Sequence, residues 1–383
     1  MTIPNIVECT TLRGKRVLLR LDLNVPLEGK EIRDAYRIVK ALPTIAYLRE
    51  AGARVVIVSH IGKGKKEDTL RPVAEYLNKK FPVTFLEKLE NIENERITRD
   101  MNDGDVVLLE NLRHSKGEEM NDPVFAAYLA TLGDVYVNDA FAVSHRAHAS
   151  VVGVVALLPH YAGLQMAEEV SRLAVAFLPE HPFLFVLGGS KISTKMSLLK
   201  KFLDIADHVF VGGAIVNNLL KVKGYEIGTS LYDATELDGL SAVLLSDRLI
   251  LPTDVVVKNE AGSEAKDVSA VTQGDAIVDV GPVTIRQLES VVGMAKLIVW
   301  NGPLGFYEEG FTDGTRELLE LIGESNATSI IGGGDTVALI SELGMADKFS
   351  FVSTGGGAML DFLANETLPG IVALQSGSAT LTQ

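Results

Sequence analysis

The chain is poor in the features that stabilise secreted or membrane proteins. It has one cysteine, Cys9, so no disulfide can form within the chain, and this suits a reducing cytoplasm. Cys9 lies in a polar segment without a nearby histidine, and we interpret it as an incidental thiol. No apolar run reaches the roughly 18 residues that a membrane-spanning helix needs, and the start of the chain lacks the apolar core of a secretion signal. We therefore expect a cytoplasmic protein.

Positive charge is also scarce. The chain has 36 lysines and arginines against 50 aspartates and glutamates, a net charge of −14. This balance argues against nucleic acid or an anionic membrane as a partner, and it makes any local cluster of cations informative. The hydrophobic share of 47% is typical of a globular protein, and 383 residues suggest two domains of about 150–200 residues each.

Three common nucleotide-binding motifs are absent. No Gly-x-x-x-x-Gly-Lys-Ser/Thr string occurs, and the protein-kinase motifs are missing. There is also no Gly-x-Gly-x-x-Gly turn followed by an acidic residue about twenty positions later, as a dinucleotide-binding domain would have. Any nucleotide site must therefore be built differently.

What the chain does have is a repeated alternation of strand and helix. This pattern predicts parallel sheets with helices on both faces. In the first half we predict strands at 16–21, 53–59, 83–86, 105–110 and 134–137, with helices at 36–51 and 69–81. The amphipathic stretch 163–178 lies between prolines and predicts a helix that links two domains. The fold class we expect is α/β, with two doubly wound parallel-sheet (Rossmann-like) domains joined by a hinge helix.

The strands of the two halves end differently. Five apolar runs of the second half stop at glycines: 183–187, 208–211, 297–300, 329–331 and 351–353. Ligands of open α/β sheets bind beyond the carboxyl ends of the strands, where glycine lets backbone amides approach a nucleotide. The second half is therefore predicted to hold a nucleotide.

Strands of the first half stop instead at polar and cationic side chains. The cations at or just past these strand ends are Arg37, His60, Lys63, Arg113, His145, Arg146 and His148. Ordinary surface charges are the plain alternative, but solvated charges have no reason to gather at one sheet edge. We interpret the group as the site of a small anion, because a guanidinium can grip one with a bidentate fork.

Other residues at strand ends could also bind a ligand or a metal ion. Lys191 and Lys195 follow Gly188-Gly189 four residues apart, and we predict that the first turn of the next helix, near 193, carries both. They would then share one helical face and bind a polyphosphate. A solvated basic helix face is the alternative. Asp335 follows three glycines and can be an N-cap, a Mg²⁺ ligand, or both.

Arg20, Asp22 and Asn24 alternate along an extended segment before Pro26, so they share one side of it. The two shorter side chains suit a hydroxylated substrate. They suit equally a turn before the proline.

Longer strings resemble the phosphoglycerate kinase family. They lie, in the family's order, at 18–26, 59–62, 109–113, 138–141, 145–150, 300–305, 332–336 and 353–357. The resemblance covers nearly the whole chain, and several strings are specific. It implies a glycolytic and gluconeogenic kinase that reversibly transfers the acyl phosphate of 1,3-bisphosphoglycerate to MgADP, giving 3-phosphoglycerate and ATP, by direct in-line transfer after hinge closure.

The resemblance also implies domains and site residues. The domains are 1–162 for 3-phosphoglycerate or 1,3-bisphosphoglycerate, 163–178 as the interdomain helix, 179–367 for the Mg-nucleotide, and 368–383 as a tail returning to the first domain. The substrate residues are Asp22, Asn24, Arg37, His60, Lys63, Arg113 and Arg146. The nucleotide residues are Lys195, Gly212, Gly213, Glu308, Gly333, Gly334, Asp335 and Thr336, with Asp335 toward the metal. Arg37, Lys195 and Lys191 are the expected catalytic residues, and the amides of Gly355, Gly356 and Gly357 are expected at the transition state.

Three positions depart from the family's usual pattern. Lys63 stands where arginine is usual, so the charge is kept but the bidentate fork is lost. Thr194 stands where an aspartate is common, and His114 where an aromatic residue is common. The family is usually monomeric. A two-domain glycosyltransferase or dehydrogenase, and a ligand-binding descendant without catalysis, are the rival interpretations, and fold alone does not exclude them.

Overall fold

The chain forms two compact units, which are described separately. The computed structural model describes residues 3–29, 31–192, 195–234 and 239–376. The first unit holds the chain up to Ser171 together with the segment from Thr367 onward, and the second holds Arg172–Glu366. The change from one to the other falls within α6 (Leu164–Ala174). A 3-10 helix, Val175–Phe177, follows directly, so the α-helix predicted over 163–178 ends at Ala174.

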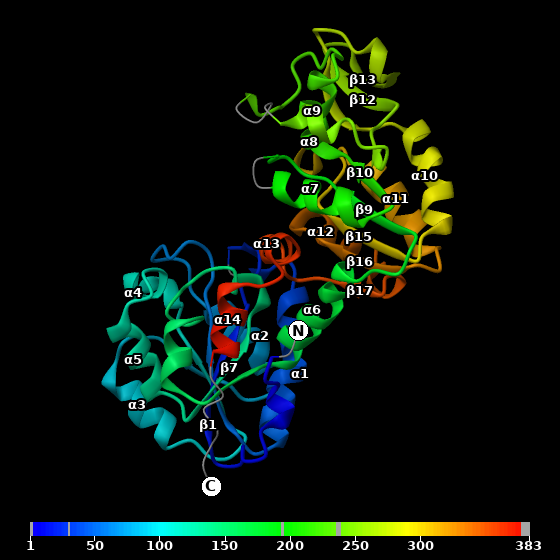
Figure 1. Ribbon diagram of the computed structural model, residues 1–383. Coiled ribbons are helices and arrows are strands. Elements are labelled where there is room, and N and C mark those ends of the chain that lie inside the picture. The colour runs from blue at the N-terminus through cyan, green and yellow to red at the C-terminus, as the bar shows by residue number, and fades with distance from the viewer. Residues whose placement is uncertain (1–2, 30, 193–194, 235–238, 377–383) are drawn as a thin grey trace. The chain divides into compact units, whose positions relative to one another are not determined.

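The first unit is built on a six-stranded parallel sheet. Its order is β5-β6-β4-β1-β7-β8 (Figure 1). The strands are β1 (Arg16–Leu21), β4 (Arg54–Val58), β5 (Thr84–Leu86), β6 (Val106–Leu109), β7 (Val135–Asp139) and β8 (His160–Ala162). A short antiparallel hairpin of β2 (Leu27–Glu28) and β3 (Glu31–Ile32) precedes the first helix. The five predicted strands are confirmed, with ends that differ by at most two residues.

Helices connect these strands. They are α1 (Tyr36–Glu50), α2 (Arg71–Asn78), α3 (Ile92–Arg99), α4 (Lys116–Glu119), α5 (Pro123–Thr131) and, from the C-terminal segment, α14 (Pro369–Gln375). The Gly370 N–H donates to the carbonyl of Ser144 at 2.8 Å, which joins the C-terminal segment to this unit. The predicted tail continues to residue 383, but its part beyond 376 lies outside the described residues.

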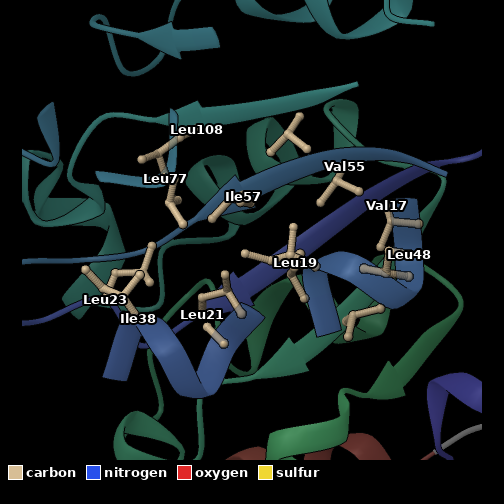
Figure 2. Close-up of a cluster of buried hydrophobic side chains, with 14 of the residues drawn as sticks. Val17, Leu19, Leu21, Leu23, Ile38, Leu48, Val55, Ile57, Leu77 and Leu108 are labelled. Carbon is tan, nitrogen blue, oxygen red and sulfur yellow. The ribbon is translucent and has the colours of Figure 1, made fainter. Parts of the chain in front are cut away.

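Alternation along β1 explains why this sheet is covered on both faces. Val17, Leu19 and Leu21 pack with Ile38 and Leu48 of α1 (Figure 2). Leu18 points to the opposite face and packs with residues of α5. Successive side chains of a strand point to opposite faces, so a strand that is apolar throughout needs cover on both sides. By the same alternation Arg20 lies on the face of Leu18, yet it is 1% exposed.

The second unit contains its own six-stranded parallel sheet. Its order is β11-β10-β9-β15-β16-β17. The strands are β9 (Phe183–Leu187), β10 (His208–Val211), β11 (Leu249–Ile250), β15 (Leu297–Asn301), β16 (Thr328–Gly332) and β17 (Phe351–Val352). All five runs that were predicted to end at glycines are therefore parallel neighbours in one sheet, and their glycine turns share one edge of it (Figure 1).

The connecting helices of the second unit follow the predicted alternation with one exception. They are α7 (Met196–Ile205), α8 (Gly213–Val222), α9 (Leu240–Val243), α10 (Pro282–Met294), α11 (Asp313–Gly323), α12 (Gly334–Glu342) and α13 (Gly357–Asn365). The exception is an antiparallel sheet of β12 (Asp254–Asn259), β13 (Gly262–Asp267) and β14 (Ala276–Val280). The expectation that strand and helix alternate to the end of the chain is therefore wrong here.

The architecture confirms the α/β class with two parallel sheets. In the described part of the chain, no helix is both long and apolar enough to cross a bilayer. Because each sheet is parallel, all of its strands present their carboxyl ends at one edge, and loops from distant parts of the sequence meet there.

Candidate functional site

In the first unit, three predicted residues form one contact set beyond the end of β1. The Arg37 guanidinium of α1 contacts the Asp22 carboxylate at 2.7 Å, and it also donates to the Asn24 carbonyl at 3.3 Å. The side-chain oxygen of Asn24 accepts from the Gly62 N–H at 3.0 Å, which joins this segment to the loop after β4. Asp22 is 8% exposed while the Arg37 side chain is 30% exposed, so the guanidinium is held from the protein side and remains accessible.

His60 lies at the centre of the predicted cationic group. It follows β4 directly and is 3% exposed. Burial lowers the pKa of its imidazole well below the ordinary value, and the charges of Arg20, Arg113, Arg146 and Arg37 lower it further. Those four arginines follow or lie in β1, α1, β6 and β7, so the structure gathers cations from separate strand ends around one neutral ring. We call these four arginines, with His60 and His148, the cationic cluster.

The remaining predicted residues of this unit lie at the edge of the cluster. Arg113 donates to the Gly62 carbonyl, and the pKa of its guanidinium is lowered by burial and by Arg146. Arg146 is exposed, and its Nε lies 3.1 Å from His145 Nε2. Lys63 is exposed on the loop after Gly62, where its backbone N–H donates to Asp68 at 2.8 Å. This arrangement of cations can therefore bind an anionic ligand, whose charge would compensate theirs.

His148 of this cluster should make the free energy of unfolding depend on pH. Burial, followed by the charges of Arg20 and Arg146, lowers its pKa from 6.5 to about 4. The unfolded chain binds the proton between these two values and the folded chain does not, so the contribution of His148 to stability is complete above pH 6.5 and is lost as the pH falls toward 4.

We therefore expect urea unfolding to show a loss of stability in the wild type between pH 7 and pH 5 that exceeds the loss in His148→Gln by about 1–2 kcal/mol. The comparison cancels the contribution of other titrating groups. Equal losses in the two proteins would contradict the expectation.

In the second unit, Lys195 lies with its ammonium against the glycine turns at Gly189 and Gly302. It occupies the N-cap position of α7, is 7% exposed, and its Nζ donates to the Gly188 carbonyl at 2.6 Å. Burial lowers the pKa of the ammonium to about 8, and the charge of Asp335 opposes that shift. A buried ammonium with one protein acceptor has further N–H groups to offer an anion.

Lys191 does not share this environment. α7 begins at Met196, so the prediction that Lys191 and Lys195 share the first turn of one helix is wrong. Lys191 is exposed and precedes the helix, and the Lys195 N–H donates to the Ile192 carbonyl at 2.9 Å. The predicted helix start at 193 and the departure at Thr194 lie outside the described residues.

The glycines of the sheet edge have two different roles. A Cβ on Gly188 would lie 2.2 Å from the Pro303 carbonyl oxygen, and a Cβ on Gly213, whose φ is +63°, would lie 2.5 Å from the Gly189 nitrogen. These glycines let neighbouring turns pack backbone against backbone. Gly334, Gly356 and Gly357 differ, since no described atom lies within 4 Å of a Cβ placed there. α12 and α13 begin at Gly334 and Gly357, and the first N–H groups of a helix have no partner within the helix, so these starts suit an anion.

A cavity of about 460 Å³ lies beside these turns, wholly within the second unit. Predicted residues that line it are Gly213, Glu308 and Asp335. Its apolar wall includes Val216, Leu231, Val278, Val280 and Phe306. A cavity of this size with an apolar wall and a few polar groups suits a nucleotide-sized ligand. The other predicted nucleotide residues, Gly212, Gly333, Gly334, Thr336 and Lys195, are not part of its lining. Gly212 packs closely against Leu304 of the lining, since a Cβ on Gly212 would lie 2.7 Å from that side chain.

Asp335 and Glu308 are two of the acidic residues that line this cavity. The pKa of Asp335 is raised by burial and by the charge of Glu308, and Lys195 lowers it. Thr336, next to Asp335 at the start of α12, is fully buried, and its hydroxyl has no hydrogen-bond partner among the described residues. Two carboxylates that repel each other beside a cavity are the kind of group that a divalent cation stabilises.

Sequence reasoning missed several residues of both sites. Asp279 and Lys258 line the cavity but belong to the antiparallel β12–β14 segment that was not predicted. Burial raises the pKa of Asp279 to about 7. In the first unit, Glu118 and Ser150 contact the cationic cluster, and neither has a local sequence pattern that would reveal it.

Comparisons with known proteins agree with this geometry. A family model described as phosphoglycerate kinase matches residues 7–366. The chain belongs to the phosphoglycerate kinase family.

Curated and solved phosphoglycerate kinases are similar along nearly the whole chain. That of Dictyoglomus turgidum is 45% identical over 381 residues, covering 95% of this chain and 96% of its own, and that of Thermosipho africanus is 44% identical over 385 residues, with the same coverage. The structure of phosphoglycerate kinase from Coxiella burnetii matches with a TM-score of 0.85 and 40% identity over 98% of this chain and 100% of that one. The structure of phosphoglycerate kinase from Pyrococcus horikoshii matches with a TM-score of 0.88 and 31% identity, covering 97% of this chain and 98% of that one. The protein is therefore an enzyme, a kinase of glycolysis.

Proposed function

We propose that this protein reversibly transfers the acyl phosphate of 1,3-bisphosphoglycerate to MgADP, with the phosphoglycerate held by the first unit and the nucleotide by the second. The observation that carries the proposal is the contrast between the two sheet edges. One gathers four arginines around a neutral histidine, and the other joins glycine turns, a buried lysine and an apolar cavity. The two edges suit a small anion and a nucleotide respectively.

In the first unit, the proposed substrate residues are Asp22, Asn24, Arg37, His60, Lys63, Arg113 and Arg146. Asp22 and Asn24 have side-chain oxygens suited to the substrate hydroxyl, although Asp22 also holds Arg37. The guanidinium groups are suited to the phosphate and carboxylate oxygens, because a planar fork matches such oxyanions. Lys63 keeps a charge at its position but not the fork.

In the second unit, the apolar wall of the cavity is suited to the base, and Glu308 to the ribose. The amides at the start of α12 and the Lys195 ammonium are suited to the phosphates. Asp335 is the residue that would hold Mg²⁺, which prefers one or two carboxylates together with substrate phosphates. Its carboxylate repels Glu308, and a cation would relieve that repulsion. When bound, Mg²⁺ supplies neutralisation of charge on the nucleotide oxygens.

Transfer needs no covalent enzyme intermediate. Positioning and neutralisation of the transferring oxygens are the main tasks of a phosphotransfer enzyme. We assign neutralisation to Arg37 and Lys195, with Lys191 as a further candidate and the amides of Gly355, Gly356 and Gly357 as additional donors. The two substrates must meet and exclude water, so we propose closure about a hinge within 159–182. A monomer acting in the cytoplasm is sufficient for this chemistry.

A coupled assay tests the proposal directly. ADP formation from ATP should require both 3-phosphoglycerate and Mg²⁺. A dehydrogenase or glycosyltransferase would show no such dependence. Tight binding of both ligands by calorimetry without turnover would instead identify a non-catalytic descendant and refute the proposed reaction.

The metal role of Asp335 predicts a specific change in Mg²⁺ dependence. In Asp335→Asn, the Mg²⁺ concentration for half-maximal activity should rise roughly tenfold or more, because one anionic ligand is lost. The KM for 3-phosphoglycerate should stay within a factor of two or so, since that site lies in the other unit. Asp347→Asn, on an exposed 3-10 helix of the same unit, is the matched control. An unchanged Mg²⁺ requirement in Asp335→Asn would rule out the assignment.

A further inference from the structure

Glu118 is a buried carboxylate behind the cationic cluster. It lies in α4, is 1% exposed, and is not one of the residues assigned to the substrate or the nucleotide. A carboxylate this deeply buried must be compensated by hydrogen bonds or cations. Its oxygens accept from the Ser150 hydroxyl at 2.6 Å and from the Ser150 N–H at 3.0 Å, and His148 Nδ1 lies 3.7 Å away.

The Ser150 hydroxyl links this carboxylate to Arg20. A hydroxyl has one proton to donate, and Ser150 gives it to Glu118. Its lone pairs are then available to the Arg20 Nε–H, which donates to Ser150 Oγ at 2.8 Å. Both bonds join buried groups that are far apart in the sequence, since Arg20 lies in β1, Glu118 in α4, and Ser150 follows β7. The direction of donation therefore runs from Arg20 through Ser150 to Glu118.

The far end of Arg20 contacts His60. Arg20 Nη2 lies 3.2 Å from His60 Nδ1, and Arg20 Nη1 donates to the Leu21 carbonyl. A guanidinium has no acceptor, so His60 Nδ1 must accept in this contact. A neutral imidazole that accepts at Nδ1 bears its proton on Nε2. Burial and the surrounding arginines keep His60 neutral, because they lower its pKa well below the ordinary value.

We infer that Glu118 and Ser150 are positioning residues: through Arg20 they hold His60 as the Nε2–H tautomer, so that its ring can donate to an oxygen of an anionic substrate. Neither residue needs to touch the substrate. The inference rests on the proposed substrate site, because it assigns His60 a donor role within that site.

A purely structural role for Glu118 makes different predictions. The carboxylate could simply anchor α4, whose Glu118 carbonyl also accepts from the Ala149 N–H at 2.9 Å. Loss of that anchor would lower stability but would leave the protonation of His60 unchanged. The tautomer of His60 therefore separates the two roles.

The first experiment measures that tautomer in the ligand-free protein. Nitrogen-15 NMR of the histidine rings should show His60 protonated at Nε2 in the wild type at pH 7. In Ser150→Ala, the Arg20 Nε–H loses its acceptor without any change of charge. We expect His60 to become a mixture of the two tautomers there. In Glu118→Gln the side-chain amide can donate to Ser150 Oγ, so it competes with the Arg20 Nε–H for the lone pairs of the hydroxyl, and we expect the same mixture.

Kinetics give the second readout. Ser150→Ala should raise the KM for 3-phosphoglycerate about five- to tenfold and change the KM for ATP by less than twofold. Ser150→Ala is the cleaner variant, since Glu118→Gln also removes a negative charge that opposes anion binding. Asp134→Asn is the matched control. Asp134 holds Arg16 at 2.6 Å at the amino-terminal edge of the same sheet, so its loss weakens an arginine–carboxylate contact away from the cluster.

The outcomes are distinct. An Nδ1–H tautomer in the wild type would overturn the inference, and so would an Nε2–H tautomer that persists in both variants. A tautomer mixture in both variants with a raised KM for 3-phosphoglycerate supports it. If Glu118→Gln fails to fold, Ser150→Ala alone decides, since it removes only a hydroxyl. Absence of any transfer by the wild type would refute the proposed function, whereas the NMR result does not depend on activity.

Discussion

Replacing Lys195 by alanine is expected to lower kcat by about three orders of magnitude and to raise the KM for the nucleotide by less than tenfold. One N–H of the ammonium is already committed to the Gly188 carbonyl at 2.6 Å, which fixes its position before any ligand arrives. A preorganised donor of this kind is worth most when charge moves between oxygens during transfer, and loss of one such donor typically costs about 10²–10³ in rate. Steady-state kinetics with both substrates varied measure the two parameters separately.

Two further variants sharpen this test. Lys200→Ala removes an exposed lysine from the same helix and should leave kcat within about twofold of the wild type. Lys195→Arg keeps the charge but changes the shape of the donor, and should recover only part of the lost rate. Turnover of Lys195→Ala above about a tenth of the wild-type value would remove Lys195 from the transfer step.

The protonation of Lys195 should also appear in the pH profile. Burial lowers its pKa to about 8, so the free enzyme loses this charge as the pH rises through that value. We expect kcat/KM for the nucleotide to fall above pH 8 or so, and kcat to fall only at higher pH, because bound phosphates favour the ammonium form. Lys195→Arg should lack this fall, since a guanidinium stays protonated.

Replacing Arg37 by alanine is expected to lower kcat by about two to three orders of magnitude, with a smaller effect on the KM for 3-phosphoglycerate. The contacts of Arg37 Nη1 with the Asp22 carboxylate and the Asn24 carbonyl hold the guanidinium in place, and its other N–H groups remain to meet a transferring oxygen. Loss of the Arg37 side chain also leaves Asp22, which is only 8% exposed, without the cation that pairs with its carboxylate. Single-turnover measurements with saturating substrate separate transfer from binding.

Arg33 supplies the matched control for Arg37. It pairs with Glu28 at 2.7 Å, but both side chains are more than half exposed. Surface pairs of this kind contribute little, so Arg33→Ala should keep wild-type kinetics. Arg37→Lys should remain well below wild type, because the ammonium cannot span both Asp22 and the substrate. Equal activity of Arg37→Ala and Arg33→Ala would show that Arg37 has no part in transfer.

Local patterns predicted most of the parallel framework. The nearly continuous apolar runs of β1, β4, β6 and β7 identified strands buried on both faces, and the glycines after β9 and β10 identified turns at one sheet edge. Such patterns work because the side-chain period of a strand and the special backbone freedom of glycine are local properties. The antiparallel β12–β14 segment escaped prediction, since its strand β13 is exposed along nearly its whole length and has no apolar alternation to mark it.

Side-chain environments were harder to predict than elements. Lys191 and Lys195 are alike in sequence, both following the glycines after β9, yet one is exposed and the other is buried against Gly188. The spacing of four residues would have placed them together only if a helix had already begun. The turn after β9 packs at Gly188 against Pro303, which follows a strand distant in the sequence, and no local pattern reveals that contact.

By itself, the sequence determined the α/β class, the contrast between cationic and glycine-lined strand ends, and the family to which the chain belongs, because these depend on residue order alone. Only the tertiary structure decided which groups are desolvated and which are paired. The burial of Lys195 and the path from Glu118 through Ser150 and Arg20 to His60 each join segments far apart in the chain. Desolvation and hydrogen bonding shift pKa values only through atoms in contact, and parallel strands bring those atoms together solely in the folded chain.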